Sequence, residues 1–293
     1  MLEIRGLTRR FGDLVAVDDV SFTVPAGGLT GFVGGNGAGK TTTMRMAMGV
    51  LAHHAGEVRW QGRPVDAADR RRFGYMPEER GLYPKQPILE QLVYLARLRG
   101  LQPAAARGEI IELLERFGLG ERTKEPLQKL SLGNQQRVQI VAALVPRPDM
   151  LILDEPFSGL DPLAIDAMTD LLRERAASGV PVVFSSHQLD LVDQLCDRLV
   201  VMARGRVVAE GTADELRAGA PLRYRIRLGA DAGWVRELSG LQVVDVSGPE
   251  AVLDVLSDGA EQQLLGQAAA RGPVHDFSRV VPRLSEIYRE VTA

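Results

Sequence analysis

The fold of this chain is decided by the stretch GFVGGNGAGKTTTM, residues 31 to 44. An apolar strand leads into a glycine-rich loop, and a lysine and three threonines follow where a helix can begin. The stretch fits the pattern G-x-x-x-x-G-K-[ST], with Gly34, Gly39, Lys40 and Thr41 in the fixed positions. Glycines allow backbone N–H groups to approach an anion, and the positive end of the following helix dipole points at the same place. The pattern therefore predicts a binding site for a nucleoside triphosphate.

In this site Lys40 would bridge the β- and γ-phosphates, and the Thr41 hydroxyl would be a ligand of Mg²⁺. An acidic partner for the metal is expected in MLILDEP, residues 150 to 156, where an apolar strand ends in two carboxylates. Asp154 would hold Mg²⁺ directly or through water, and Glu155 would orient or deprotonate the attacking water. The expected nucleotide-binding loop comprises Gly34, Gly35, Asn36, Gly37, Ala38, Gly39, Lys40, Thr41 and Thr42.

Length and composition are those of an ordinary globular protein. The chain has 293 residues, of which 45% are hydrophobic and 25% charged, so it can form a large core, and its length favours two domains. The net charge of −3 gives no basic field for nucleic acid. The first residues lack the apolar region of a signal peptide, and no run approaches the roughly eighteen apolar residues of a membrane span. We therefore expect a soluble, cytoplasmic chain.

The order of patterns along the chain predicts an α/β fold. Short strand-like runs flank the glycine-rich loop at residues 2–27 and 56–65, which indicates an antiparallel sheet. Residues 88–118 have apolar residues at helical spacing, and from residue 150 strands and helices alternate as in a parallel sheet covered by helices. From about residue 221 the character changes: LRYRIRL alternates strictly, and a helix is expected near 261–271. A small α+β domain is predicted over 221–293, ending in the amphipathic stretch PRLSEIYREV.

Five motifs in order resemble the nucleotide-binding subunit of ABC transporters: the phosphate loop, LSLGNQQR, LILDEP, SGLDP and SSH. The resemblance covers roughly residues 1 to 217. It implies a P-loop NTPase core with an antiparallel β subdomain and a helical subdomain at about 85–145, and it implies that the nucleotide is ATP. It further implies a head-to-tail dimer, either of this chain or with a paired ATPase subunit, that holds two ATP molecules between its subunits.

The same resemblance assigns five further residues. Ser131 and Gly133 of the signature motif LSLGNQQR would contact the γ-phosphate of the ATP held by the other subunit. Asp161 of SGLDP would cross that interface. His187 matches the histidine that touches the γ-phosphate, and Phe11 matches the aromatic residue that stacks on adenine.

Three departures from the family pattern stand out. Gly35 replaces the usual proline of the phosphate loop, which should loosen the loop without removing a ligand. In the signature, which the family usually writes LSGGQ, Leu132 replaces a glycine, and Asn134 stands where the glutamine usually starts. In FGYMPEERGLYP, Glu78 replaces the glutamine that reaches Mg²⁺ and senses the membrane partner. A carboxylate can ligand Mg²⁺, so we expect ATP hydrolysis to be retained with a changed metal affinity.

The variant PEERGLYP, the LGNQQR signature and the added C-terminal domain resemble a subgroup in which the ATPase pairs with a separately encoded polytopic permease, usually as an exporter. The resemblance thus implies an ATP-hydrolysing motor subunit, peripheral on the inner face of the cell membrane through its permease. Motion would reach the permease through the segment from Glu78 to Glu90. The alternatives are a soluble ABC-type ATPase acting on DNA or ribosomes, and a regulatory module with an inactive site. The role of residues 221–293 and the transported substance stay open.

Overall fold

The computed structural model describes residues 1–79, 81–145, 147–218, 221–281 and 286–288. The chain divides into two compact units, one covering Met1–Ala213 and the other beginning at Asp214. Helix α8 (Ala213–Ala218) starts at this division. Each unit is described by itself. The domain limits of 217 and 221 expected from the sequence stay a prediction.

The first unit begins with a four-stranded antiparallel sheet in the order β2-β1-β4-β5. Its strands are β1 (Leu2–Phe11), β2 (Leu14–Val24), β4 (Ala55–Trp60) and β5 (Arg63–Pro64). Alternate residues of β1 and β2 point into the core, so one face of this sheet is buried. The sheet is the one that the runs around the glycine-rich loop predict.

A six-stranded sheet in the order β10-β9-β3-β8-β7-β6 forms the centre of the unit. Its strands from β9 to β6 are parallel to one another, and β10 returns antiparallel beside β9. The strands β3, β7 and β8 are buried throughout, as expected for a sheet covered on both faces. The bounds are β3 (Leu29–Val33), β6 (Phe73–Met76), β7 (Met150–Leu153), β8 (Val182–Ser186), β9 (Arg198–Ala203) and β10 (Arg206–Gly211).

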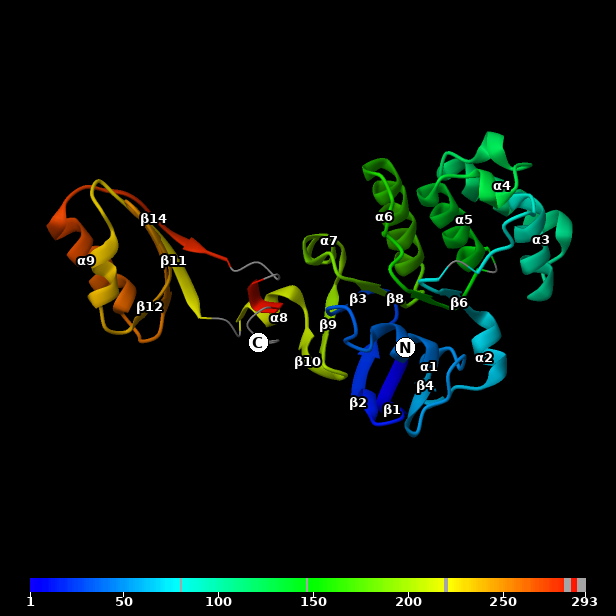
Figure 1. Ribbon diagram of the computed structural model, residues 1–293, viewed down its shortest axis with the longest axis horizontal. Coiled ribbons are helices and arrows are strands. Elements are labelled where there is room, and N and C mark those ends of the chain that lie inside the picture. The colour runs from blue at the N-terminus through cyan, green and yellow to red at the C-terminus, as the bar shows by residue number, and fades with distance from the viewer. Residues whose placement is uncertain (80, 146, 219–220, 282–285, 289–293) are drawn as a thin grey trace. The chain divides into compact units, whose positions relative to one another are not determined.

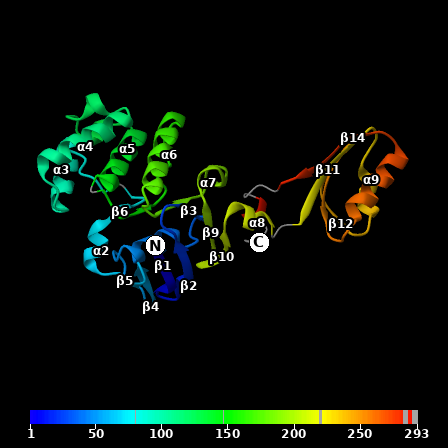
Figure 2. The same ribbon diagram turned by 180° about the vertical axis from the view of Figure 1, so that it is seen from behind.

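Helices cover both faces of the central sheet (Figures 1 and 2). On one face α6 (Pro162–Ala177) and α7 (Leu189–Leu195) pack against β3, while α1 (Lys40–Ala47) lies on the other face with the antiparallel sheet. One apolar core joins the two sheets and α1, and the ring of Phe22 lies 5.0 Å from that of Phe32 across them. The short helix α2 (Ala67–Arg72) precedes β6 and begins with a capping box between Asp66 and Asp69.

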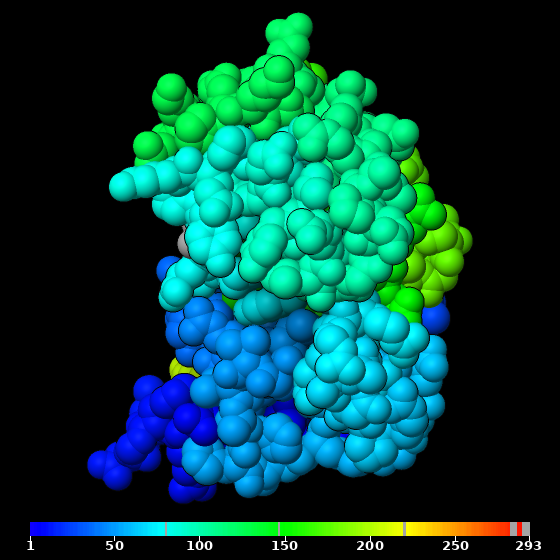
Figure 3. Space-filling view, turned by 90° about the vertical axis from the view of Figure 1, so that its right-hand side faces the viewer, coloured from blue at the N-terminus to red at the C-terminus, as the bar shows by residue number. Residues whose placement is uncertain are grey.

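A helical part is inserted between β6 and β7 and stands above the antiparallel sheet in Figure 3. It contains α3 (Ile88–Leu98), α4 (Pro103–Arg116), α5 (Leu132–Leu144) and the 3₁₀ turns η1 (Gly120–Arg122) and η2 (Leu127–Lys129). The apolar spacing of residues 88–118 predicts α3 and α4 because their inward faces carry the leucines and isoleucines that pack together.

The second unit contains a four-stranded antiparallel sheet in the order β12-β13-β11-β14. Helix α9 (Ala260–Arg271) follows the hairpin of β12 and β13, and its Leu264 and Ala268 share a core with Ile226 of β11. The remaining bounds are β11 (Leu222–Leu228), η3 (Gly233–Glu237), β12 (Leu241–Ser247), β13 (Glu250–Val255) and β14 (Val274–Val280). The unit is thus α+β. Of the expected terminal stretch at 282–291, only 286–288 are described, as helix, and the rest lies outside the described residues.

Candidate nucleotide-binding site

The glycine-rich loop connects β3 to α1 and can take its path only without side chains at two positions. Gly39, at the start of α1, has a φ of 105°, and a Cβ there would lie 2.6 Å from the Ala16 carbonyl oxygen. A Cβ on Gly34 would lie 2.5 Å from the Met202 carbonyl oxygen. Backbone from β2 and β9 therefore presses directly on the loop and fixes its shape.

Lys40 is the first residue of α1, and it turns back into this loop. Its side chain is only 7% exposed, and Nζ donates to the carbonyl oxygen of Gly34 at 2.6 Å and to that of Gly35 at 3.3 Å. Both acceptors are neutral carbonyls, so neither opposes the attraction of this ammonium group for an anion.

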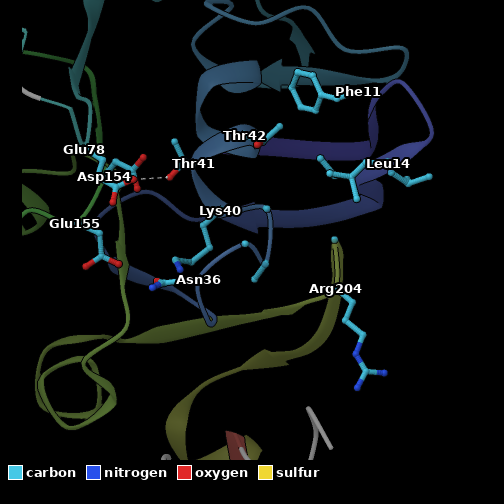
Figure 4. Close-up of a pocket in the computed structure, with 16 residues that line it drawn as sticks. Phe11, Leu14, Asn36, Lys40, Thr41, Thr42, Glu78, Asp154, Glu155 and Arg204 are labelled. Carbon is cyan, nitrogen blue, oxygen red and sulfur yellow. Dashed lines mark hydrogen bonds between the residues drawn. The ribbon is translucent and has the colours of Figure 1, made fainter.

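A cavity of about 560 Å³ opens over the loop (Figure 4). One end is made by Lys40 and Thr41 with the acidic side chains Glu78, Asp154 and Glu155, and the other by the β1–β2 turn. The cavity also borders the β9–β10 turn. Its lining residues are Phe11, Leu14, Val15, Ala16, Asn36, Gly37, Ala38, Gly39, Lys40, Thr41, Thr42, Glu78, Asp154, Glu155, Arg204 and Gly205.

The acidic end of the cavity holds a buried carboxylate oxygen without a partner. Asp154 follows β7 and is fully buried; the Ser185 hydroxyl donates to its Oδ1 at 2.6 Å. Its Oδ2 has no hydrogen-bond partner among the described residues. Across the cavity, the Thr41 hydroxyl donates to Oε2 of Glu78 at 3.3 Å, shown as the dashed line in Figure 4. The structure therefore brings Thr41, Glu78 and Asp154 together, as the sequence predicts.

Glu155 is held in an unusual backbone conformation. Its φ is +50°, in the left-handed region that non-glycine residues seldom adopt. Its N–H donates to the Ser185 hydroxyl oxygen at 2.8 Å, so Ser185 joins the two consecutive acids. The carboxylate Oε2 lies 3.0 Å from Nδ1 of His187, and both side chains border a second hollow of about 520 Å³ with Asn36 and Glu78.

The signature residues lie at the start of α5. Ser131 caps the helix by accepting from the N–H of Asn134 at 3.3 Å. A Cβ on Gly133 would lie 2.6 Å from the carbonyl oxygen of Gly159, whereas Leu132 is 62% exposed. Ser131 and Gly133 do not line the cavity of their own chain.

The two remaining predicted residues, Asp161 and Phe11, lie at the start of α6 and at the end of β1. Asp161 caps α6 through the N–H of Ala164 at 2.9 Å and pairs with the guanidinium of Arg137 on α5. Phe11 is exposed at the end of β1, and the guanidinium of Arg9 lies 4.7 Å from its ring centre. The Phe11 ring borders the cavity at the end opposite the carboxylates (Figure 4).

Sequence reasoning missed three residues at this site. Ser185 is the first residue of a serine pair after an apolar run, and nothing in the run indicates its bonds to Asp154 and Glu155. Gln136 donates to the carbonyl oxygen of Glu155 from α5, which is remote in sequence. Arg204 borders the cavity from the β9–β10 turn with a φ of 49°.

A strand, a glycine-rich loop, a helix beginning with lysine, and a second strand ending in two acids define a P-loop NTPase. A family model described as "ABC transporter" matches residues 17–158, and one described as "ATP-binding protein DrrA1-3-like, C-terminal domain" matches residues 211–292. The uncharacterized ABC transporter ATP-binding protein YhaQ of Bacillus subtilis is 36% identical over 99% of this chain and 98% of its own length. The chain belongs to the ABC transporter ATP-binding proteins, a family of ATP-hydrolysing subunits.

Two relatives have named roles, and solved structures share the fold. The daunorubicin/doxorubicin resistance ATP-binding protein DrrA of Streptomyces peucetius is 38% identical over 74% of this chain and 67% of its own length. The Nod factor export ATP-binding protein I of Burkholderia lata is 38% identical over 73% of this chain and 72% of its own. A solved ATP-binding subunit of an ABC transporter superposes with a TM-score of 0.70 at 35% identity, covering 74% of this chain and 92% of that chain.

Proposed function

We propose that this chain is the motor subunit of an exporter, in which ATP binding closes a dimer and hydrolysis reopens it. The observation that carries the proposal is the cavity over the phosphate loop, which joins a buried cation to an unpartnered buried carboxylate oxygen. The cation matches a phosphate chain, and the free oxygen matches the metal that accompanies it.

The nucleotide would lie along the cavity with its phosphates over the loop. Lys40 would exchange its carbonyl contacts for the β- and γ-phosphates, and the N–H groups from Asn36 to Thr42 would surround the β-phosphate. The adenine would lie at the opposite end, where the exposed ring of Phe11 borders the cavity.

The acidic end fits Mg²⁺, because a fully buried carboxylate oxygen without a donor is costly unless a cation accompanies it. Thr41 and Asp154 would hold the ion, and Glu78 would be a third oxygen ligand in place of an uncharged amide. When bound, Mg²⁺ supplies charge neutralisation for the leaving phosphate oxygens.

Glu155 would accept the proton of the attacking water as the bond from the γ-phosphorus to the bridging oxygen breaks. Its carboxylate already lies 3.0 Å from His187, so the imidazole restricts the direction in which the carboxylate points. His187 would also reach the γ-phosphate, which places it between the base and the group that is transferred. A positioned base contributes about 10²- to 10⁴-fold to such a step.

A second subunit would complete each site. Ser131 and Gly133 lie at the start of α5, away from the cavity of their own chain, so they would contact ATP held by the partner. Asp161 would cross the same interface. ATP bound between two subunits stabilises their association, and at a hundred times its Kd one ligand contributes about 2.7 kcal/mol. Hydrolysis removes the shared γ-phosphate and the dimer opens.

The permease is expected to dock where the helical part exposes large apolar side chains. Tyr83, in the segment from Glu78 to Glu90, and Tyr94 and Leu98 of α3 are exposed. Movement at the metal end would reach them through that segment. Among the described residues, no helix combines the length and apolarity that a membrane span requires. Attachment to the inner face of the cell membrane would therefore depend on the separate polytopic chain. Export is supported by the names of the relatives that serve drug resistance and Nod factor export.

Co-purification tests the assignment to a transporter. The tagged chain should recover a polytopic membrane protein in stoichiometric amount from detergent-solubilised membranes of its own host. Recovery of ribosomes or DNA-repair proteins instead would refute the motor role.

The base is tested by Glu155→Gln. This variant should bind ATP with unchanged affinity, lose at least a hundredfold in kcat, and accumulate as an ATP-dependent dimer in size-exclusion chromatography. Wild-type turnover would exclude Glu155 as the base.

A further inference from the structure

The segment that follows β7 is clamped between β8 and the first turns of α5. Gln136 is only 5% exposed, and its Nε2 donates to the carbonyl oxygen of Glu155 at 3.1 Å and to that of Pro156 at 3.4 Å. From the other side, the Ser185 hydroxyl accepts from the N–H of Glu155. Both backbone polar groups of Glu155 are thus bonded to side chains from elements remote in sequence, and its carbonyl oxygen also accepts from the N–H of Ser158 at 3.2 Å.

These two bonds matter because Glu155 has a φ of +50°. A non-glycine residue keeps this conformation only where its surroundings over-determine it. A relaxed backbone at this position would swing the Cα–Cβ bond and move the carboxylate away from His187. The direction of the carboxylate therefore depends on the bonds at its own amide and carbonyl.

Two more contacts attach the same turns of α5 to this segment. Gly133 approaches Gly159 so closely that a Cβ would lie 2.6 Å from the Gly159 carbonyl oxygen. Arg137 pairs with Asp161 and also donates to the Phe117 carbonyl oxygen at 2.9 Å. The start of α5 and the segment from Glu155 to Asp161 are therefore in contact at Gln136, Gly133 and Arg137.

We propose that Gln136 is a positioning residue for ATP hydrolysis: it holds the Glu155 carbonyl and so transmits the position of the start of α5 to the carboxylate of its own chain. The inference rests on the proposed role of Glu155 as the base. Ser131 and Gly133 lie on the same turns of α5, so engagement of ATP held by one subunit would align the base that acts on ATP held by the other.

A purely structural role for Gln136 is the alternative, and a matched control separates the two. Gln91 of α3 is also fully buried and donates to two backbone carbonyls, those of Gln86 at 3.2 Å and Tyr83 at 3.4 Å. It is absent from both hollows at the proposed site. Gln136→Met and Gln91→Met therefore both remove two side-chain bonds to backbone carbonyls at comparable burial, and Gln91→Met also removes the bond that Oε1 accepts from the N–H of Tyr83 at 3.0 Å.

The experiment measures ATP affinity, steady-state kcat and KM, and thermal unfolding of the full-length variants. Gln136→Met should lower kcat at least tenfold while its Kd for ATP and KM stay within twofold of wild type, since only the geometry of the base changes. Gln91→Met should keep kcat within twofold of wild type, although its Tm should fall by as much as that of Gln136→Met. Gln136→Glu, which turns an acceptor toward the two carbonyls, should lose at least as much kcat and serves if the Met variant does not fold.

The Glu155→Gln background supplies the decisive comparison. Because Gln136 acts through Glu155, Gln136→Met should change the residual single-turnover rate of Glu155→Gln by less than twofold. An equal loss in both backgrounds, or a kcat within twofold of wild type for Gln136→Met, would overturn the inference. If Glu155→Gln itself turned over like wild type, the proposed base and this inference would fail together. If Glu155→Gln lost activity but Gln136→Met did not, the inference on Gln136 would fail and the assignment of Glu155 as the base would survive.

Discussion

Asp154 in the first unit and Asp254 in the second are both almost inaccessible to solvent, with exposed fractions of 0% and 7%. Both oxygens of Asp254 accept from one guanidinium, that of Arg223, at 2.6 Å and 3.0 Å. Asp154 has one oxygen bonded to Ser185 and the other without a partner among the described residues. A buried acid that is fully paired stabilises its fold, whereas one left half paired indicates a place for a ligand.

The largest effect is expected from Asp154→Asn. Removing the charge should lower Mg²⁺-dependent ATP turnover by about a thousandfold, because the metal loses a ligand and the nucleotide its neutralising ion. The free energy of unfolding should stay within about 1 kcal/mol of wild type, since no paired charge is broken. Rates and chemical denaturation are compared with Asp166→Asn, an exposed aspartate of α6. A large loss of stability together with activity would erase the distinction between the two aspartates.

The reverse outcome is expected from Asp254→Asn. It removes the carboxylate charge beside the buried Arg223 guanidinium, which keeps its pair with Glu286, and should destabilise the second unit by about 2 kcal/mol. Hydrogen exchange of β11 and β13 measures this loss locally, and ATP turnover should stay within twofold of wild type. Asp245→Asn on the neighbouring β12, where the aspartate is exposed, is the control and should leave exchange unchanged. Protection equal to wild type would show that the pair contributes nothing.

A third aspartate sharpens the comparison through pH. The hydrogen bond from Arg63 lowers the pKa of Asp69 from 3.8 to about 2, against the opposing effect of burial. Because the folded pKa is depressed, the stabilisation is fully present above pH 3.8 and is lost as the pH falls through 2. The difference in free energy of unfolding between wild type and Asp69→Asn should be about 1 kcal/mol at pH 6 and should vanish toward pH 2. A difference that grows on acidification would contradict the pairing.

Local rules of the chain predict much of the cassette. The loop from Gly34 to Lys40 follows from backbone requirements that only glycine meets, and the period of the apolar residues predicts α3, α4 and β11 with their limits close to those observed. The five motifs predicted the family, which the comparisons confirm. The bonds that connect Ser185 and Gln136 to Glu155 join elements far apart in sequence, so no local pattern contains them. The roles assigned to the site residues stay predictions.

The contrast between Leu132 and Gly133 bears on how such loops are recognised in new genomes. The side chain at 132 points into solvent, while the carbonyl of Gly159 closes the space beside 133. A search pattern for this loop should therefore accept any residue at the position of Leu132 and require glycine at the position of Gly133. A pattern that requires glycine at both positions would miss chains in which only the second position is too crowded for a side chain.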